Sequence, residues 1–234
     1  HKTVYAGVGK SDREIYDALM LGIEAFNCES LQEIFVINEM AHLHGVKANI
    51  SVRINPDIDA HTHKYVTTGL YENKFGISNH EFDKLIEFIQ KSEHINFIGL
   101  HFHIGSQITR VDEVFSLECK RVNEIVKYFE SKGLTVRNIN LGGGLGVDYD
   151  DPDGNPIADF KTWFNAIDRN IIRRADQTVH VEPGRSLVAQ CASLISRVLF
   201  VKSGETKNFL IMDAGINDLI RPAVYGAYYK IEDL

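Results

Sequence analysis

The sequence predicts an α/β fold: a partial (β/α)8 TIM-type barrel of about six of the eight βα units, followed by the start of a C-terminal β domain. Short apolar segments alternate with amphipathic helical segments along most of the chain, which is typical of parallel strands joined by helices. Polar or Gly-rich clusters follow several strands rather than one. That distribution favours a barrel over a doubly wound sheet with a single ligand crevice.

The strands and helices follow from hydrophobic periodicity and end signals. Apolar runs predict six parallel strands at residues 3–8, 23–27, 46–54, 95–104, 134–141 and 178–181. Ser-x-x-Glu capping boxes at Ser11, Ser30 and Ser78 predict three helices, and Gly22 and Gly45 end the first two. Apolar periodicity predicts two more helices, over about 111–132 and 160–174.

The alternation of predicted strands and helices ends near the C-terminus. Apolar runs at 192–201 and 208–213 are separated by too few residues for a crossover helix, so they predict an antiparallel pair. We therefore expect residues 1–188 to form the barrel, as its strands 3 to 8, and residues 189–234 to begin a second, β domain. The chain opens on His1 rather than Met and supplies six units of eight, so we expect a piece of a longer protein that continues at both ends.

Composition narrows the functional class. The 234 residues contain 25 Lys plus Arg and 32 Asp plus Glu, a net charge of −7, which argues against nucleic-acid binding. No apolar run reaches the roughly 18–20 residues that a membrane helix needs, so no membrane partner is expected. Three widely spaced cysteines, Cys28, Cys119 and Cys191, indicate a reducing, cytoplasmic compartment.

Two histidines close the fourth predicted strand. His101 and His103 are two residues apart and share one face of a strand, so their imidazoles are expected to point together. One hypothesis is a metal site of a barrel hydrolase. The alternative, a packed histidine beside a functional one, is favoured because no carboxylate lies at a typical ligand offset. We therefore predict no metal ligands.

A glycine run follows the fifth strand. Gly142, Gly143 and Gly144 let backbone N–H groups approach an anion, and Ser106 at a neighbouring strand end can add a hydroxyl. A phosphate site and an ordinary tight turn both remain open.

The sixth strand ends in Glu182-Pro183-Gly184-Arg185. One interpretation is a mutual salt bridge. The other is a carboxylate for a ring nitrogen and a guanidinium for a carboxylate or phosphate. Further on, Arg221 and Tyr225 could clamp a carboxylate, or they could belong to a solvated turn.

Residues 55–77 lack periodicity and contain His61 and His63. Structureless segments of this length are usually functional or disordered. The aromatic residues and the single proline favour an ordered active-site loop, and the two histidines are expected to be solvated rather than metal-bound.

Together these clusters resemble the fold-type III decarboxylases that depend on pyridoxal 5'-phosphate (PLP). The segments 59–76 and 217–227 are most similar to the diaminopimelate branch of that family. The residues that carry the resemblance are Gly7-Val8-Gly9-Lys10, Phe26-Asn27-Cys28-Glu29-Ser30, Arg53-Ile54-Asn55-Pro56, Asn73-Lys74-Phe75-Gly76, His101-Phe102-His103-Ile104-Gly105-Ser106, Gly142-Gly143-Gly144, Glu182-Pro183-Gly184-Arg185 and Asn217-Asp218-Leu219-Ile220-Arg221-Pro222.

The resemblance implies a role for each matching residue. His103 is expected to stack on the pyridine ring, and Glu182 to bind its nitrogen. The phosphate is expected to lie among Ser106, Gly142, Gly143, Gly144, Gly184 and Arg185. Arg185, Arg221 and Tyr225 are expected to hold the distal end of an amino-acid substrate.

The resemblance also implies a longer, homodimeric enzyme with its active site at the subunit interface, which decarboxylates meso-2,6-diaminopimelate to L-lysine. The family's Schiff-base lysine motif does not occur in this sequence. Neither does its C-terminal Cys-Glu-Ser motif, because Cys28-Glu29-Ser30 aligns with a barrel strand. We therefore expect this piece alone to be inactive. The alternatives are a decarboxylase of ornithine, arginine or carboxynorspermidine, the metal-dependent hydrolase, or a non-catalytic PLP-binding homologue.

Overall fold

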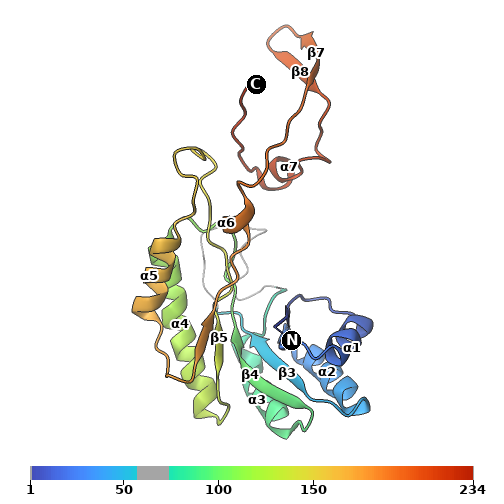
Figure 1. The fold of residues 1–234 in the computed structure, drawn as a ribbon, viewed down its shortest axis with the longest axis vertical. Helices are drawn as coiled ribbons and strands as arrows, with labels where there is room; N and C mark the ends of the chain where they lie inside the picture. Colours follow the sequence, from blue (N-terminus) through green and yellow to red (C-terminus); the bar gives the residue numbers. More distant parts are fainter. Residues whose placement is uncertain (1, 57–73, 234) are drawn as a thin grey trace.

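A computed structural model of the chain describes residues 2–56 and 74–233. Six strands form one parallel sheet in chain order and curl into part of a barrel (Figure 1). They are β1 (Val4–Tyr5), β2 (Ala25–Cys28), β3 (Ala48–Arg53), β4 (Ile95–His101), β5 (Asn138–Asn140) and β6 (Thr178–His180). The predicted partial barrel is confirmed. Of the unpatterned segment 55–77, residues 57–73, including His61 and His63, lie outside the described part.

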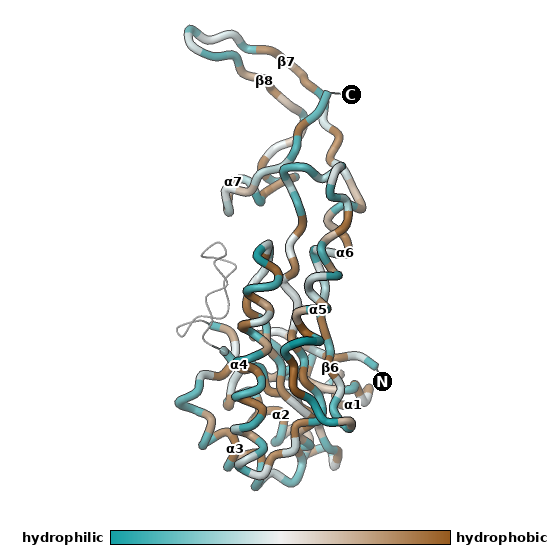
Figure 2. Tube along the Cα trace, turned by 90° about the vertical axis from the view of Figure 1, so that its left-hand side faces the viewer, coloured by the Kyte–Doolittle hydropathy of each residue, from teal (hydrophilic) through white to brown (hydrophobic). Residues whose placement is uncertain are grey.

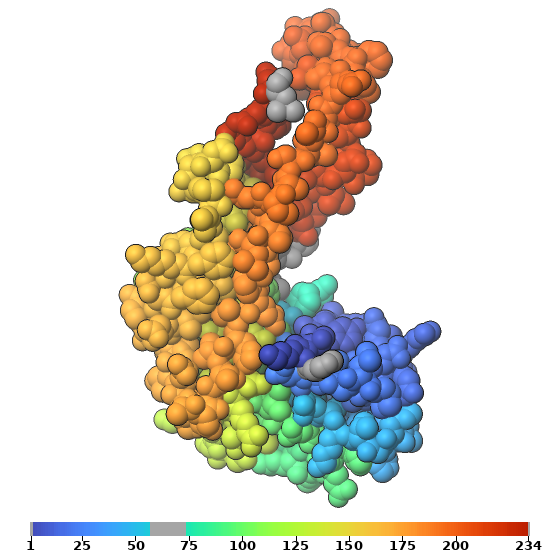
Figure 3. Space-filling view, viewed as in Figure 1, coloured from blue at the N-terminus to red at the C-terminus, as the bar shows by residue number. Residues whose placement is uncertain are grey.

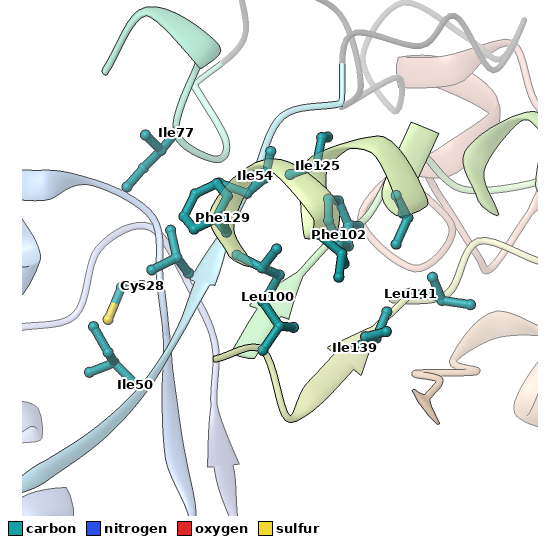
Figure 4. Close-up of a cluster of buried hydrophobic side chains, with 14 of the residues drawn as sticks. Cys28, Ile50, Ile54, Ile77, Leu100, Phe102, Ile125, Phe129, Ile139 and Leu141 are labelled. Atoms are coloured by element: carbon teal, nitrogen blue, oxygen red, sulfur yellow. The ribbon is translucent and has the colours of Figure 1, made fainter. Parts of the chain in front are cut away.

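The connecting helices cover the sheet and supply one hydrophobic core. They are α1 (Asp12–Met20), α2 (Leu31–Leu43), α3 (Phe82–Lys91), α4 (Val111–Ser131) and α5 (Phe160–Asn170), with a 3-10 turn η1 (Asn79–Glu81) before α3. Apolar side chains of adjacent strands, such as Ile50, Leu100 and Ile139, belong to this core together with Phe129 of α4 (Figure 4). No helix of the described part combines the length and apolar character needed to cross a membrane.

The three predicted capping boxes have different outcomes. At Ser11 both reciprocal bonds form, as predicted. At Ser30 the hydroxyl accepts from the Glu33 N–H, but the Glu33 carboxylate accepts from the Glu29 N–H instead. The prediction of a capping box at Ser78 is wrong. The Ser78 side chain makes no capping hydrogen bond, because residues Asn79–Glu81 form η1 before α3 begins.

Several predicted elements are shorter in the structure. The fifth strand, expected over 134–141, pairs only at Asn138–Asn140, and the helix expected to reach 174 ends at Asn170. A strand extends only as far as its hydrogen-bond ladder to a neighbouring strand, whereas buried apolar residues can continue beyond that ladder and lengthen the pattern in the sequence.

The C-terminal part leaves the barrel. β7 (Val198–Ser203) and β8 (Asn208–Met212) pair antiparallel, as predicted, and extend away from the half-barrel (Figures 1 and 3). Every residue of both strands is exposed, including their hydrophobic stretches (Figure 2). Two short helices that the sequence did not predict, α6 (Arg185–Val188) and α7 (Arg221–Tyr225), lie between the barrel and this hairpin.

Candidate active site

The carboxyl ends of the parallel strands bring four polar residues to one point. The amide nitrogen of Asn140, at the end of β5, donates to Glu182 Oε1 at 2.8 Å, and Asn27 of β2 reaches the same oxygen at 3.4 Å. His101 Nε2, at the end of β4, lies 3.3 Å from Glu182 Oε2, at ion-pair distance but without hydrogen-bond alignment. Asn27, Asn140 and the His101 contact were not predicted, because they follow from strand order and not from a local motif.

These contacts keep Glu182 ionised. Partial burial favours the neutral acid, but the His101 contact and the Asn140 hydrogen bond outweigh it and lower the pKa of Glu182 to about 2. The side chain is 39% exposed, so this anion faces open space at the strand ends.

His103, in contrast, is held in its uncharged form. Its Nδ1 accepts a hydrogen bond from the Gly143 N–H at 3.2 Å, which requires an unprotonated Nδ1. Burial, followed by the positive charge of Arg53 and the electrostatic effect of His101, lowers the pKa of His103 to about 4. The imidazole is therefore neutral near pH 7.

The glycine run packs directly against neighbouring backbone. A Cβ on Gly142 would lie 2.2 Å from the Phe102 carbonyl oxygen, and one on Gly143 would lie 2.1 Å from that of Glu182. Gly144, at φ +105°, would place a Cβ 2.3 Å from the Gly105 oxygen. These glycines are therefore sterically required, and they lie beside the Gly105-Ser106 segment, as expected.

A second polar cluster surrounds Arg185. Its guanidinium donates to the Ser106 hydroxyl at 3.1 Å and to the Tyr149 hydroxyl at 2.9 Å. Arg221 donates to the same Tyr149 hydroxyl at 3.0 Å and to that of Tyr229 at 2.7 Å. Sequence patterns alone missed both tyrosines. In the described part of the chain Arg185 makes no salt bridge with Glu182, so the mutual-pair interpretation of that motif is wrong.

A cavity with a volume of about 780 Å³ adjoins this cluster. Its lining includes Tyr149, Arg185, Arg221 and Tyr225. It does not include His103 or Glu182, so the guanidinium cluster and the Glu182 cluster are neighbouring but separate parts of the site.

Another buried ionic group, which the sequence did not reveal, lies at the ends of β2 and β3. Glu29 accepts from Arg53 Nη1 at 2.7 Å and from the Gly76 N–H at 2.9 Å. Both charged side chains are buried. The Arg53 guanidinium also lies 4.8 Å from the centre of the Phe75 ring.

The residues present fit PLP. The site combines an anionic carboxylate, a neutral imidazole, a glycine run with no room for side chains, and a guanidinium whose buried Nε has no hydrogen-bond partner in the described part. Such groups suit a protonated ring nitrogen, a ring face and a phosphate. No set of three or more His, Cys, Asp or Glu among residues 2–56 and 74–233 is placed to hold a metal ion.

Comparison with known proteins agrees with a site for PLP. A family model described as the pyridoxal binding domain of pyridoxal-dependent decarboxylases matches residues 1–189. The chain is 50% identical over its whole length to a diaminopimelate decarboxylase of Bacteroides thetaiotaomicron, covering 60% of that protein. It is 41% identical over 99% of its length to one from Neisseria meningitidis, covering 56% of it. The chain thus spans little more than half the length of these relatives.

Solved structures agree. The crystal structure of Helicobacter pylori diaminopimelate decarboxylase complexed with L-lysine matches 97% of the chain with a TM-score of 0.84 at 39% identity, covering 56% of that protein. A viral arginine decarboxylase from Paramecium bursaria Chlorella virus, at 21% identity and a TM-score of 0.77 over 96% of this chain and 57% of that one, shares the fold. The chain belongs to the family of pyridoxal-dependent decarboxylases and carries their pyridoxal-binding domain.

Proposed function

We propose that the full-length protein decarboxylates meso-2,6-diaminopimelate to L-lysine with PLP. The observation that carries this proposal is the pairing of two charge-selective regions: the anion Glu182 at the strand ends, and the guanidinium groups of Arg185 and Arg221 beside a cavity. The first region suits a cationic ring nitrogen, and the second suits the carboxylate that remains on the product. The lysine complex of the H. pylori relative supports the same substrate class.

In this mechanism Glu182 keeps the ring nitrogen protonated, because a carboxylate with a pKa of about 2 remains the base partner of a hydrogen bond rather than taking the proton. His101 and Asn140 hold that carboxylate in place. Bound PLP supplies an electron-withdrawing ring that delocalises the electron pair left when the substrate carboxylate departs as CO₂.

The remaining residues of the site bind and orient the cofactor and the substrate. The neutral imidazole of His103 covers the ring face without adding a charge. Ser106, Gly142, Gly143, Gly144, Gly184 and Arg185 hold the phosphate. Arg185, Arg221 and Tyr225 bind the distal carboxylate of the substrate. Ornithine and arginine present a cation at that end, which the two guanidinium groups disfavour.

We further propose a cytoplasmic homodimer with its active site at the subunit interface, and a second domain that begins at residue 189. The free, buried thiols of Cys28 and Cys119 support a reducing compartment. The uncovered apolar strands β7 and β8 support a β domain that requires further partner strands. Light scattering of the full-length protein tests the dimer.

Substrate choice tests the proposed activity. The full-length protein with PLP should release CO₂ from meso-2,6-diaminopimelate and far less from ornithine. Arg221→Gln should lower kcat/KM for diaminopimelate about ten- to hundredfold, since one charged hydrogen bond contributes about 1.5–3 kcal/mol. Arg13→Gln, an exposed residue of α1, is the matched control. Preference for ornithine, or the absence of CO₂ release, would contradict the proposal.

A further inference from the structure

We propose that Tyr149 is a positioning residue that holds Arg185 and Arg221 together so that both guanidinium groups receive a single carboxylate. This inference rests on the proposed function. It adds a residue from the loop after the glycine run, which joins two arginines that are far apart in the sequence.

The geometry centres on one oxygen. Arg185 Nη1 donates to the Tyr149 hydroxyl at 2.9 Å and Arg221 Nη1 donates to it at 3.0 Å. The centre of the Tyr149 ring also lies 6.0 Å from one guanidinium carbon and 5.4 Å from the other. A phenolic oxygen has two lone pairs, so the two donors use its accepting capacity fully and its own hydrogen remains available to an anion.

Apolar packing alone does not fix the position of either arginine. Arg185 begins α6, which has four residues, and Arg221 begins α7, which has five. Neither helix has a buried residue, so no apolar core fixes its rotation. Both helices lie beyond the carboxyl ends of the sheet (Figure 1), and the Tyr149 hydroxyl is the hydrogen-bonding atom that they share in the described structure.

The charges make this contact a receptor for an anion. Two guanidinium groups that meet at one oxygen repel each other. Within the described residues, neither Arg185 nor Arg221 forms an ion pair with a carboxylate, and both line the 780 Å³ cavity together with Tyr149. Two guanidinium forks and a hydroxyl donor match a carboxylate, which accepts several hydrogen bonds and offsets the repulsion.

Two ligands that differ only by this carboxylate isolate the effect. L-Lysine keeps the carboxylate that remains after one CO₂ is lost from diaminopimelate, and 1,5-diaminopentane is lysine without it. Calorimetric titration of the full-length holoenzyme should show that Tyr149→Phe weakens L-lysine about tenfold. The affinity for 1,5-diaminopentane should stay within about twofold of the unmodified protein.

Two control variants distinguish a positioning role of Tyr149 from a general effect of the substitution on the folded structure. Tyr16→Phe makes the same chemical change on α1, which lies outside this cluster, and should leave both affinities unchanged. Tyr149→His keeps a ring with an acceptor nitrogen and should recover part of the lysine affinity. Thermal unfolding and bound-PLP absorbance establish that each variant is folded and loaded.

Unchanged lysine affinity in Tyr149→Phe, or equal weakening of both ligands, would overturn the inference, as would failure of Tyr149→His to restore any lysine affinity. The proposed function is tested separately by CO₂ release from diaminopimelate in the unmodified protein. A protein that released no CO₂ but lost lysine affinity on Tyr149→Phe would refute the activity and leave the positioning role intact.

Discussion

At the scale of single residues, a neutral His103 and an anionic Glu182 lie within one site. Burial, followed by the positive charge of Arg53 and the electrostatic effect of His101, lowers the pKa of His103 to about 4. Burial opposes ionisation of Glu182, but His101 and Asn140 overcome it and lower its pKa to about 2. An uncharged ring beside a fixed anion suits the proposed stacking of His103 on a cationic pyridine ring.

The His103 shift predicts a pH dependence of stability. An unfolded histidine binds a proton near pH 6.5, whereas folded His103 does so near 4, so the unfolded state binds more protons between these values. The contribution of His103 to the free energy of unfolding should therefore fall as the pH drops from 6.5 to 4, by at most about 1.4 kcal/mol per pH unit. Chemical denaturation between pH 7 and 4.5 measures this slope, and His103→Gln should reduce it.

The pH window separates His103 from the carboxyl groups whose pKa is lowered. Burial raises the pKa of Glu118 well above its usual value, so Glu118 favours folding as the pH falls and opposes the His103 slope equally in the unmodified protein and in His103→Gln. Glu182, with its pKa lowered from 4.5, adds stability above pH 4.5 and loses it only as the pH falls toward about 2. The other carboxyls with lowered pKa values, such as Asp83 and Asp159, also titrate below 4.5. Equal slopes for the unmodified protein and His103→Gln between pH 4.5 and 6.5 would contradict the assigned pKa.

At the scale of elements, the buried pair Glu29 and Arg53 joins the ends of β2 and β3 and the backbone at Gly76. Glu29→Gln should destabilise the protein by about 3–5 kcal/mol, because the buried Arg53 charge loses its partner. The double variant Glu29→Gln with Arg53→Met removes both charges and should restore much of that loss. Urea denaturation measures both, and similar destabilisation by the single and double variants would contradict the argument.

The elements that the sequence could predict are those that depend on local residues. The Ser11 capping box and the run of parallel strands depend on neighbouring residues, and both form as predicted. The Ser78 box failed because a 3-10 turn competes locally with the cap. Tyr149, Tyr229 and the Glu29–Arg53 pair escaped prediction because each contact joins segments that only the folded chain brings together.

At the scale of the whole molecule, stability is unevenly distributed. β3 has a strand on each side, and five of its six residues are buried. Within the part of the chain that the structure describes, β7 and β8 pair only with each other. Their eight apolar side chains, from Val198 to Met212, are 38–69% exposed. A two-stranded hairpin with uncovered apolar faces is at best marginally stable in water.

Hydrogen exchange of this 234-residue chain should therefore separate the two regions. Amides of β3 and β4 exchange only when the half-barrel opens, so they should be protected at least about a thousandfold more than those of β7 and β8. Mass spectrometry of peptides from 48–53, 95–101 and 198–212 measures the difference. Equal protection in all three peptides would contradict the prediction. If β7 and β8 gained protection as the protein concentration rose, their apolar strands would be covered by self-association, because an intramolecular hairpin opens independently of concentration.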